Sequence, residues 1–193
     1  MESSNNLLNQ IDDLNKKYYD KNAKNIFFKK QQKRECANYI SQNVDIDILL
    51  RATIFIIPNT SHIYFDYTFL KTYATPDLYP RMIKFAITLF DECIQKYNMY
   101  EMHINLNTFT LSALERHYDV VRIFCEECLR AGQCYSEKLT KLHIYYIPSV
   151  FDKMSLLLDK FIHEEVKTKI VKYTKEESDI VTTKLYELCN KIE

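Results

Sequence analysis

Two alternating hydrophobic patterns organise residues 101–173. Every second residue from 102 to 106 is apolar, which predicts a strand. From 111 to 128 the apolar residues recur every three or four positions, which predicts a helix packed against a sheet. Residues 142–147 are again β-branched and aromatic, and Pro148 ends this second strand because proline cannot continue a ladder of hydrogen bonds.

The stretch that follows Pro148 predicts a second helix, from Ser149 to Ile162, with the Ser149 hydroxyl as N-cap. Apolar side chains cover more than half of its circumference: Val150, Phe151, Met154, Leu157, Leu158, Phe161 and Ile162. This pattern is typical of a lid over an apolar cavity, and also of an ordinary buried helix. Strand, helix and strand without a hairpin turn predict a βαβ unit with parallel strands.

The helix predicted over 111–128 carries signals for its start and its end. Ser112 and Glu115 fit a capping box near its start, and Gly132 is placed to end it. Further on, the pattern over 175–191 predicts a last helix.

Upstream, the pattern predicts more strands and helices. Residues 52–57 read as a buried strand that Pro58 stops, and 63–67 alternate as a neighbouring strand of a hairpin. Asp77 is placed to cap a helix that runs to about Tyr97.

The first 45 residues have the spacing of helices. Residues 7–18 form one apolar helical face, and 21–34 are polar and basic around Phe27 and Phe28. The lysines there (Lys24, Lys29, Lys30 and Lys33, with Arg34) are placed to approach anionic headgroups while the rings enter the interface. A solvated helix face with two core aromatics explains the same pattern. We expect an α/β fold, with a mostly parallel βαβ sheet covered by helices in 46–193 and a small helical N-terminal lobe in 1–45.

Several segments of the C-terminal half resemble the CRAL-TRIO lipid-binding domain. They are Tyr135-Ser136-Glu137-Lys138-Leu139, Lys141-Leu142-His143-Ile144-Tyr145-Tyr146-Ile147-Pro148, Phe161-Ile162 and Lys169-Ile170. The resemblance implies a pocket floored by the parallel sheet, closed by the helix after Pro148 and holding one lipid. The apolar residues placed to line it are Met102, Ile104, Leu142, Ile144, Phe151, Met154 and Leu158.

The resemblance also implies a headgroup site. Glu137 and Lys169 match the residues that take part in it in phosphoinositide-binding members. Lysine would supply charge to a phosphate and glutamate would orient the lysine, whereas an ordinary ion pair explains the two residues equally well. Ser136, Tyr146 and Val166 depart from the residues that those members carry.

Composition excludes several classes of enzyme. The chain has 193 residues and a single glycine, Gly132, which leaves no P-loop, dinucleotide fingerprint or nucleophile elbow. Cys125 and Cys128 belong to the inner stripe of a predicted helix, where cysteine behaves as a small hydrophobe rather than as a metal or redox site. His103 and His117 have no nucleophile placed by a motif. We therefore expect no enzyme, no metal site and no cofactor other than a bound lipid.

The charge balance and the cysteine content limit the partners and the location that we expect. Basic and acidic residues balance at 26 each, which gives no general attraction to nucleic acid. The start of the chain, MESSNNLLNQIDD, does not resemble a signal peptide, and six cysteines without one read as reduced thiols. These features favour a cytoplasmic protein. The resemblance implies that its partners are a lipid and, transiently, a membrane surface, and the interaction-module alternative adds a further protein.

Two functions fit these observations. The first is a carrier that transfers or presents one lipid from a pocket with a gating helix. The alternative is a lipid-free or membrane-associating protein-interaction module, with Tyr145, Tyr146 and Phe151 filling the pocket. The apolar lid favours the carrier, and the bulky Tyr146 and Val166 favour the module.

Overall fold

One five-stranded sheet forms the centre of the molecule, with its strands in the order β1-β2-β3-β4-β5. The computed structural model describes residues 2–22, 27–130, 132, 134–149 and 151–190, and the side chains of these except 2–5, 154 and 186–190. The strands are β1 (Ile54–Ile56), β2 (His62–Asp66), β3 (Tyr100–Asn105), β4 (Leu139–Tyr145) and β5 (Ile170–Lys172). β1 and β2 form the expected antiparallel hairpin, and all other neighbours are parallel. The predicted α/β class with a mostly parallel sheet is confirmed.

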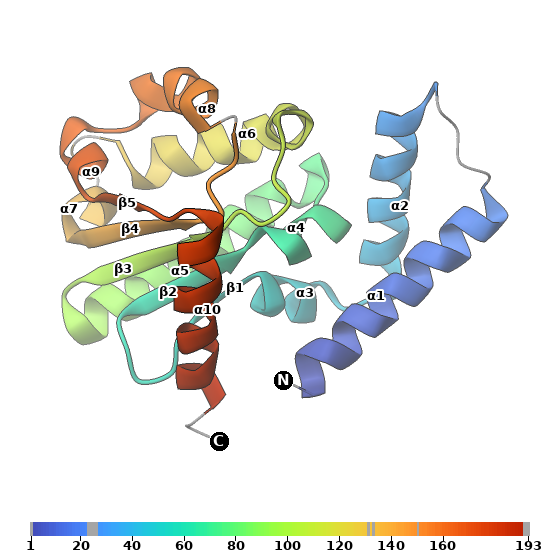
Figure 1. Cartoon of the computed structure of the whole chain (residues 1–193), viewed down its shortest axis with the longest axis horizontal. Helices are drawn as coiled ribbons and strands as arrows, with labels where there is room; N and C mark the ends of the chain where they lie inside the picture. Colours follow the sequence, from blue (N-terminus) through green and yellow to red (C-terminus); the bar gives the residue numbers. More distant parts are fainter. Residues whose placement is uncertain (1, 23–26, 131, 133, 150, 191–193) are drawn as a thin grey trace.

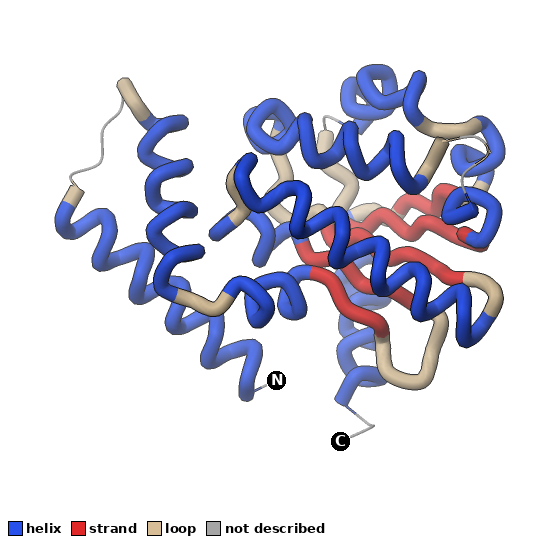
Figure 2. Tube along the Cα trace, turned by 180° about the vertical axis from the view of Figure 1, so that it is seen from behind, coloured by secondary structure: helices blue, strands red, loops and turns tan. Residues whose placement is uncertain are grey.

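Helices cover the two faces of this sheet unequally. On one face lie α5 (Tyr79–Tyr97) and α6 (Leu111–Cys128), with α8 (Phe151–Leu158) beyond α6. On the other face a single helix, α10 (Lys175–Asn190), crosses the sheet, as Figures 1 and 2 show from opposite sides. Two short helices, α7 (Cys134–Lys138) and α9 (Glu164–Thr168), flank the strands β4 and β5. The helix-covered face is therefore the one that can enclose a ligand.

The N-terminal segment forms a helical lobe beside the sheet (Figure 1). It consists of α1 (Glu2–Lys21) and α2 (Lys29–Asn43), and α2 packs on α4 (Tyr67–Tyr73). The lobe has its own buried cluster, which includes Ile11, Ile40, Leu49, Phe69 and Tyr73. Because three of these residues come from beyond position 45, the lobe shares its core with the rest of the chain. The division at residue 45 stays a prediction.

Helix α3 (Ile46–Thr53) occupies part of the segment predicted as a strand. The strand expectation for 52–57 was wrong at Ala52 and Thr53, because the Thr53 hydroxyl donates 2.8 Å to the carbonyl of Leu49 one helical turn earlier. Helix α4 was not predicted. It begins directly after β2 because the Asp66 carboxylate accepts a 2.7 Å hydrogen bond from the backbone N–H of Thr68 and caps it.

The start signals of two other helices were also misassigned. Thr110, not Ser112, is the N-cap of α6: its backbone is extended and its hydroxyl accepts a 3.3 Å bond from the N–H of Ala113. Asp77 lies inside a short 3-10 turn, η1 (Pro76–Leu78), and α5 starts after it. Gly132 lies beyond the end of α6 at φ +75°, a conformation that glycine adopts without strain.

The helix predicted from Ser149 to Ile162 is shorter than expected. Its regular part is α8, followed by the 3-10 turn η2 (Asp159–Phe161). Val150 lies outside the described residues. The strand before it ends at Tyr145 instead of Ile147, because Tyr146 adopts a left-handed φ of 53°. Its N–H donates instead to the hydroxyl of Ser178 on α10, at 2.7 Å.

Candidate lipid-binding cavity

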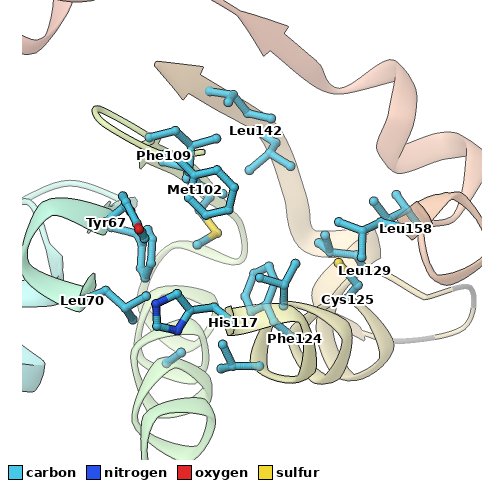
Figure 3. Close-up of a pocket in the computed structure, with 18 of the residues that line it drawn as sticks. Tyr67, Leu70, Met102, Phe109, His117, Phe124, Cys125, Leu129, Leu142 and Leu158 are labelled. Carbon is cyan, nitrogen blue, oxygen red and sulfur yellow. The ribbon is translucent and has the colours of Figure 1, made fainter. Parts of the chain in front are cut away.

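A cavity of about 390 Å³ lies between the sheet and helices α5 and α6. The side chains that line it are mainly aliphatic and aromatic, and Figure 3 shows them converging on one space. A volume in this range fits a small-molecule ligand, and pockets lined this way hold their ligands chiefly by excluding apolar surface from water.

Strand alternation builds the floor of this cavity. Met102 and Ile104 on β3, with Leu142 and Ile144 on β4, lie directly opposite each other in parallel register and line the cavity. Successive strand residues point to opposite faces, so the intervening residues project to the other side of the sheet. Four residues that the sequence placed in the pocket are therefore brought together.

Helix α8 closes one side of the cavity. Phe151 and Leu158 line it and are buried, as expected from the sequence. The side chain of Met154, also predicted to line the pocket, lies outside the described residues. Leu157, which belongs to the broad apolar surface of this helix, is half exposed, and Leu156 is 80% exposed. The helix thus presents one narrow buried face to the cavity and an apolar outer face to solvent.

Two residues of the alternative hypothesis lie elsewhere. Tyr145 is on the opposite face of the sheet, where its hydroxyl lies 2.7 Å from Nδ1 of His103. The hydroxyl of Tyr146 donates to Asp179 on α10, at 2.8 Å. Only Phe151, of the three tyrosine and phenylalanine residues expected to fill the pocket, lines it.

His117 is the most unusual residue in the cavity wall. It projects from α6 and is fully buried, and its Nδ1 lies 3.1 Å from the hydroxyl of Tyr79. Its Nε2 has no hydrogen-bond partner among the described residues. Burial, with a smaller contribution from Arg116, lowers the pKa of His117 to about 4, so the imidazole is neutral near pH 7. The sequence showed this histidine on a helix but gave no sign that one nitrogen would lack a partner.

Polar lining residues gather at one end of the cavity, around α8, η2, α9 and β5. They are Ser155, Asp159, Lys167 and Lys172, whereas the polar residues Thr53 and His117 line other parts of the cavity. Lys167 pairs with Asp159 and with Glu164, whereas the Lys172 ammonium lies 4.4 Å from the ring centre of Phe151. This end is more exposed than the floor, so we take it as the rim of the cavity.

The two predicted headgroup residues do not line the cavity. Glu137 is exposed on α7. The Lys169 ammonium lies 2.7 Å from the carboxylate of Glu165 and donates a 3.1 Å bond to the backbone carbonyl of Ser136. The structure thus gives Lys169 a carboxylate partner other than Glu137, and a role of either residue in headgroup binding stays a prediction.

The basic N-terminal segment is only partly described, since Lys24 lies outside the described residues. Phe27 is 93% exposed just before α2, and Phe28 is also exposed. The expectation that both rings are core residues is therefore wrong. Lys30 pairs with Glu115 of α6 at 3.0 Å.

None of the described helices combines the length and hydrophobicity needed to span a bilayer.

Comparison with known proteins agrees with this architecture. The model of the CRAL/TRIO domain matches residues 18–192. The crystal structure of Sfh5 is similar, with a TM-score of 0.50 and 14% sequence identity. The similarity covers 76% of this chain and 56% of that chain, so the protein spans about half the length of this structural neighbour. Comparison with curated protein sequences gives no match. The chain belongs to the CRAL/TRIO domain family, a family of lipid-binding and lipid-transfer proteins.

Proposed function

We propose that the protein binds a single hydrophobic ligand, such as a phospholipid, in the cavity and transfers or presents it at a membrane. The observation that carries this proposal is the cavity of about 390 Å³, which is lined mainly by apolar side chains from the sheet and from the helices that cover it. Each buried methylene contributes about 0.8 kcal/mol, so such a cavity can hold an acyl chain without polar contacts along its length.

Helix α8 is the gating element in this proposal. Its inner contacts with the cavity are confined to a few residues, including Phe151 and Leu158, so little apolar surface has to separate when it moves. A ligand then enters from the side at which the polar rim lies. The hydrocarbon part occupies the space over β3 and β4, and the headgroup remains near the rim.

A phosphorylated headgroup would find cations there. Lys172 lines the rim. Lys169 lies outside the cavity lining, between α9 and β5, with Glu137 on helix α7. Release of Lys169 from Glu165 would allow its ammonium to bind a phosphate, since a charge-assisted bond to phosphate replaces one to a carboxylate.

Membrane contact would use the N-terminal lobe. The exposed rings of Phe27 and Phe28 are adjacent to Lys29 and Lys30. Aromatic rings enter the interface while lysines approach anionic headgroups, which suits a transient contact with a membrane surface.

The proposal is tested first by the mass of any molecule released when the purified protein is denatured. We expect one lipid per chain in native mass spectra. A second test measures transfer of a labelled phospholipid between phosphatidylcholine vesicles, with and without phosphatidylinositol phosphate. Ile104→Trp, which fills the cavity floor, should abolish transfer, whereas Ile180→Trp on the exposed face of α10 should not.

A folded Ile104→Trp protein that still transfers lipid would contradict the proposal. So would a wild-type protein that carries no lipid and transfers none while it retains a stable protein partner in pull-downs. That second result would establish the alternative, a protein-interaction module of the same fold.

A further inference from the structure

The face of the sheet opposite the cavity carries a cluster of imidazoles and one carboxylate. His62 on β2 lies directly opposite Glu101 on β3, and His103 on β3 lies opposite His143 on β4. Glu101 and His103 are two residues apart on one strand, so both point to this face. The four side chains therefore occupy adjacent positions on three neighbouring strands.

Three of these residues direct ligand atoms into one space. Nδ1 of His62 lies 2.8 Å from Nε2 of His103 and 4.0 Å from the Glu101 carboxylate. All three ligand atoms lie within 4.8 Å of one another. Imidazole nitrogens bound to one zinc ion at about 2.0–2.1 Å are separated by somewhat more than 3 Å. Small rotations of these side chains are thus enough to place a cation between them.

Hydrogen bonds to neighbouring side chains that do not bind the metal orient the ligand residues. Nδ1 of His103 lies 2.7 Å from the hydroxyl of Tyr145, so a proton on Nδ1 leaves the Nε2 lone pair directed at the cluster. His143 lies 3.1 Å from the Glu101 carboxylate through Nε2 and 2.9 Å from the Tyr173 hydroxyl through Nδ1. Its Nε2–H thus donates to Glu101 while Nδ1 accepts from Tyr173. Such outer partners fix ring orientation at metal sites and contribute strongly to affinity.

The cluster is open to solvent on one side. The side chains of His62 and Glu101 are 35% and 24% exposed, whereas His103 is buried beneath them. A hydrated cation can therefore reach the two outer ligands first and then the inner one. The exposed side leaves room for water as a further ligand.

We propose that His62, Glu101 and His103 bind a divalent transition-metal ion, with Zn²⁺ as the best match to two imidazoles and one carboxylate, and that His143 is a positioning residue for Glu101. Borderline metals prefer this set of nitrogen and oxygen donors, and a hard cation such as Mg²⁺ prefers oxygen alone. The fourth position is occupied by water.

The site adjoins the cavity through the sheet. His103 lies between Met102 and Ile104, whose side chains line the cavity on the other face. A metal bound to residues of β2 and β3 would fix the spacing between β3, which forms part of the cavity floor, and β2, whose Phe65 also lines the cavity. Metal binding is therefore expected to raise the thermal midpoint of unfolding.

The test uses the full chain without a histidine tag, titrated with Zn²⁺ by calorimetry and with Co²⁺ by absorption spectroscopy. We expect one ion per chain and visible absorption bands from a tetrahedral Co²⁺ site. His62→Gln and Glu101→Gln, at partly exposed positions, should each weaken Zn²⁺ binding at least about 100-fold, and His143→Gln should weaken it about 10- to 100-fold. His163→Gln, an exposed histidine on another part of the surface, is the matched control and should bind as the wild type does.

The thermal midpoint gives an independent measurement. Added Zn²⁺ should raise it in the wild type and in His163→Gln but not in Glu101→Gln. Equal Zn²⁺ affinity in the wild type, His62→Gln and Glu101→Gln would overturn the proposal, as would a loss of binding in His163→Gln, because either result indicates adventitious binding at surface histidines. Circular dichroism of each variant shows that it is folded, so an altered affinity reports on the site.

Discussion

His117 and Tyr79 form a buried pair in the cavity wall: Nδ1 of His117 lies 3.1 Å from the tyrosine hydroxyl, which also donates a 3.2 Å bond to the carbonyl of Arg116. A hydroxyl that donates to this carbonyl accepts from Nδ1–H. The neutral ring then carries its lone pair on Nε2, the atom without a partner among the described residues. Protonation of this nitrogen in the folded protein would place a charge beside an apolar space, which burial opposes.

This pair predicts a loss of stability in acid. The pKa of His117 is lowered from its ordinary value of 6.5 to about 4, so between these values the unfolded chain binds more protons than the folded one. Stability should therefore be fully present above pH 6.5 and decrease as the pH falls towards 4, by roughly 3 kcal/mol from this residue. Urea unfolding of wild type and His117→Leu at several pH values measures the effect.

The decisive quantity is the difference in the free energy of unfolding between the wild type and His117→Leu at each pH. Between pH 6.5 and 4, the free energy of unfolding of His117→Leu should depend less on pH than that of the wild type. His163→Gln, which changes an exposed histidine, should follow the wild type. Parallel curves for wild type and His117→Leu would show that His117 does not resist protonation in the folded state.

A second prediction concerns Lys169. Lys169→Ala should weaken binding to vesicles that contain a phosphorylated lipid and leave folding intact, if the ammonium binds the phosphate. Glu165→Gln removes the carboxylate partner of Lys169 and keeps the lysine, so it should retain or strengthen this binding. Vesicle sedimentation with and without phosphatidylinositol phosphate measures both.

The two variants separate a headgroup role from a structural ion pair. If Lys169 only connects Glu165 of α9 with the carbonyl of Ser136 on α7, both substitutions should lower stability and leave vesicle binding unchanged. The Glu165 carboxylate is exposed to solvent, so the expected change in stability is small. Lys172→Ala is a useful third variant, since this lysine lies at the cavity rim.

The N-terminal lobe should unfold together with the rest of the chain. Ile46 and Leu78 pack against both buried clusters, that of the lobe and that of the sheet. Ile40→Ala, at a fully buried position in the lobe, should therefore lower the free energy of unfolding by about 2–5 kcal/mol within a single transition. Ile48→Ala, at an exposed position, should change it by less than about 0.5 kcal/mol. Two separate transitions in urea would instead support an independent lobe ending near residue 45.

Cysteine reactivity should follow burial. Burial raises the pKa of both Cys125 and Cys128 to about 12, so almost none of either thiol is ionised at pH 8. Cys134 is exposed. Iodoacetamide at pH 8 should therefore modify Cys134 first and leave the other two intact in the folded protein, as measured by peptide mass mapping. Early modification of Cys125 would indicate that the cavity wall opens to solvent.

Local patterns were sufficient for much of the fold. The alternation over 102–106 and the three-to-four spacing over 111–128 predicted β3 and α6, and the side-chain alternation placed Met102 and Ile104 on the cavity floor. One error lies where a single residue serves two elements. Asp66 is both the last residue of β2 and the cap of α4, so the strand pattern concealed the helix.

The cluster at His62, Glu101 and His103 shows what local patterns cannot supply. In the sequence, His62 and His103 are polar neighbours of alternating apolar residues, and Glu101 stands just before one of these alternations. The meeting of the three side chains depends on which strands are neighbours and in what register. The same holds for Lys169, whose pairing with Glu165 depends on α9, a helix of five residues that no periodic pattern marks. Distances across strands separated by about forty residues follow from tertiary packing alone.

The outermost strands of the sheet, β1 and β5, are each three residues long. Such short edge strands expose few unpaired backbone N–H and C=O groups, so another chain has few groups with which to pair and extend the sheet. If helix α8 moves to admit a ligand, short edge strands leave few backbone groups with which a second copy could pair. We therefore expect the length of β1 and β5 to limit association between copies while the cavity is open.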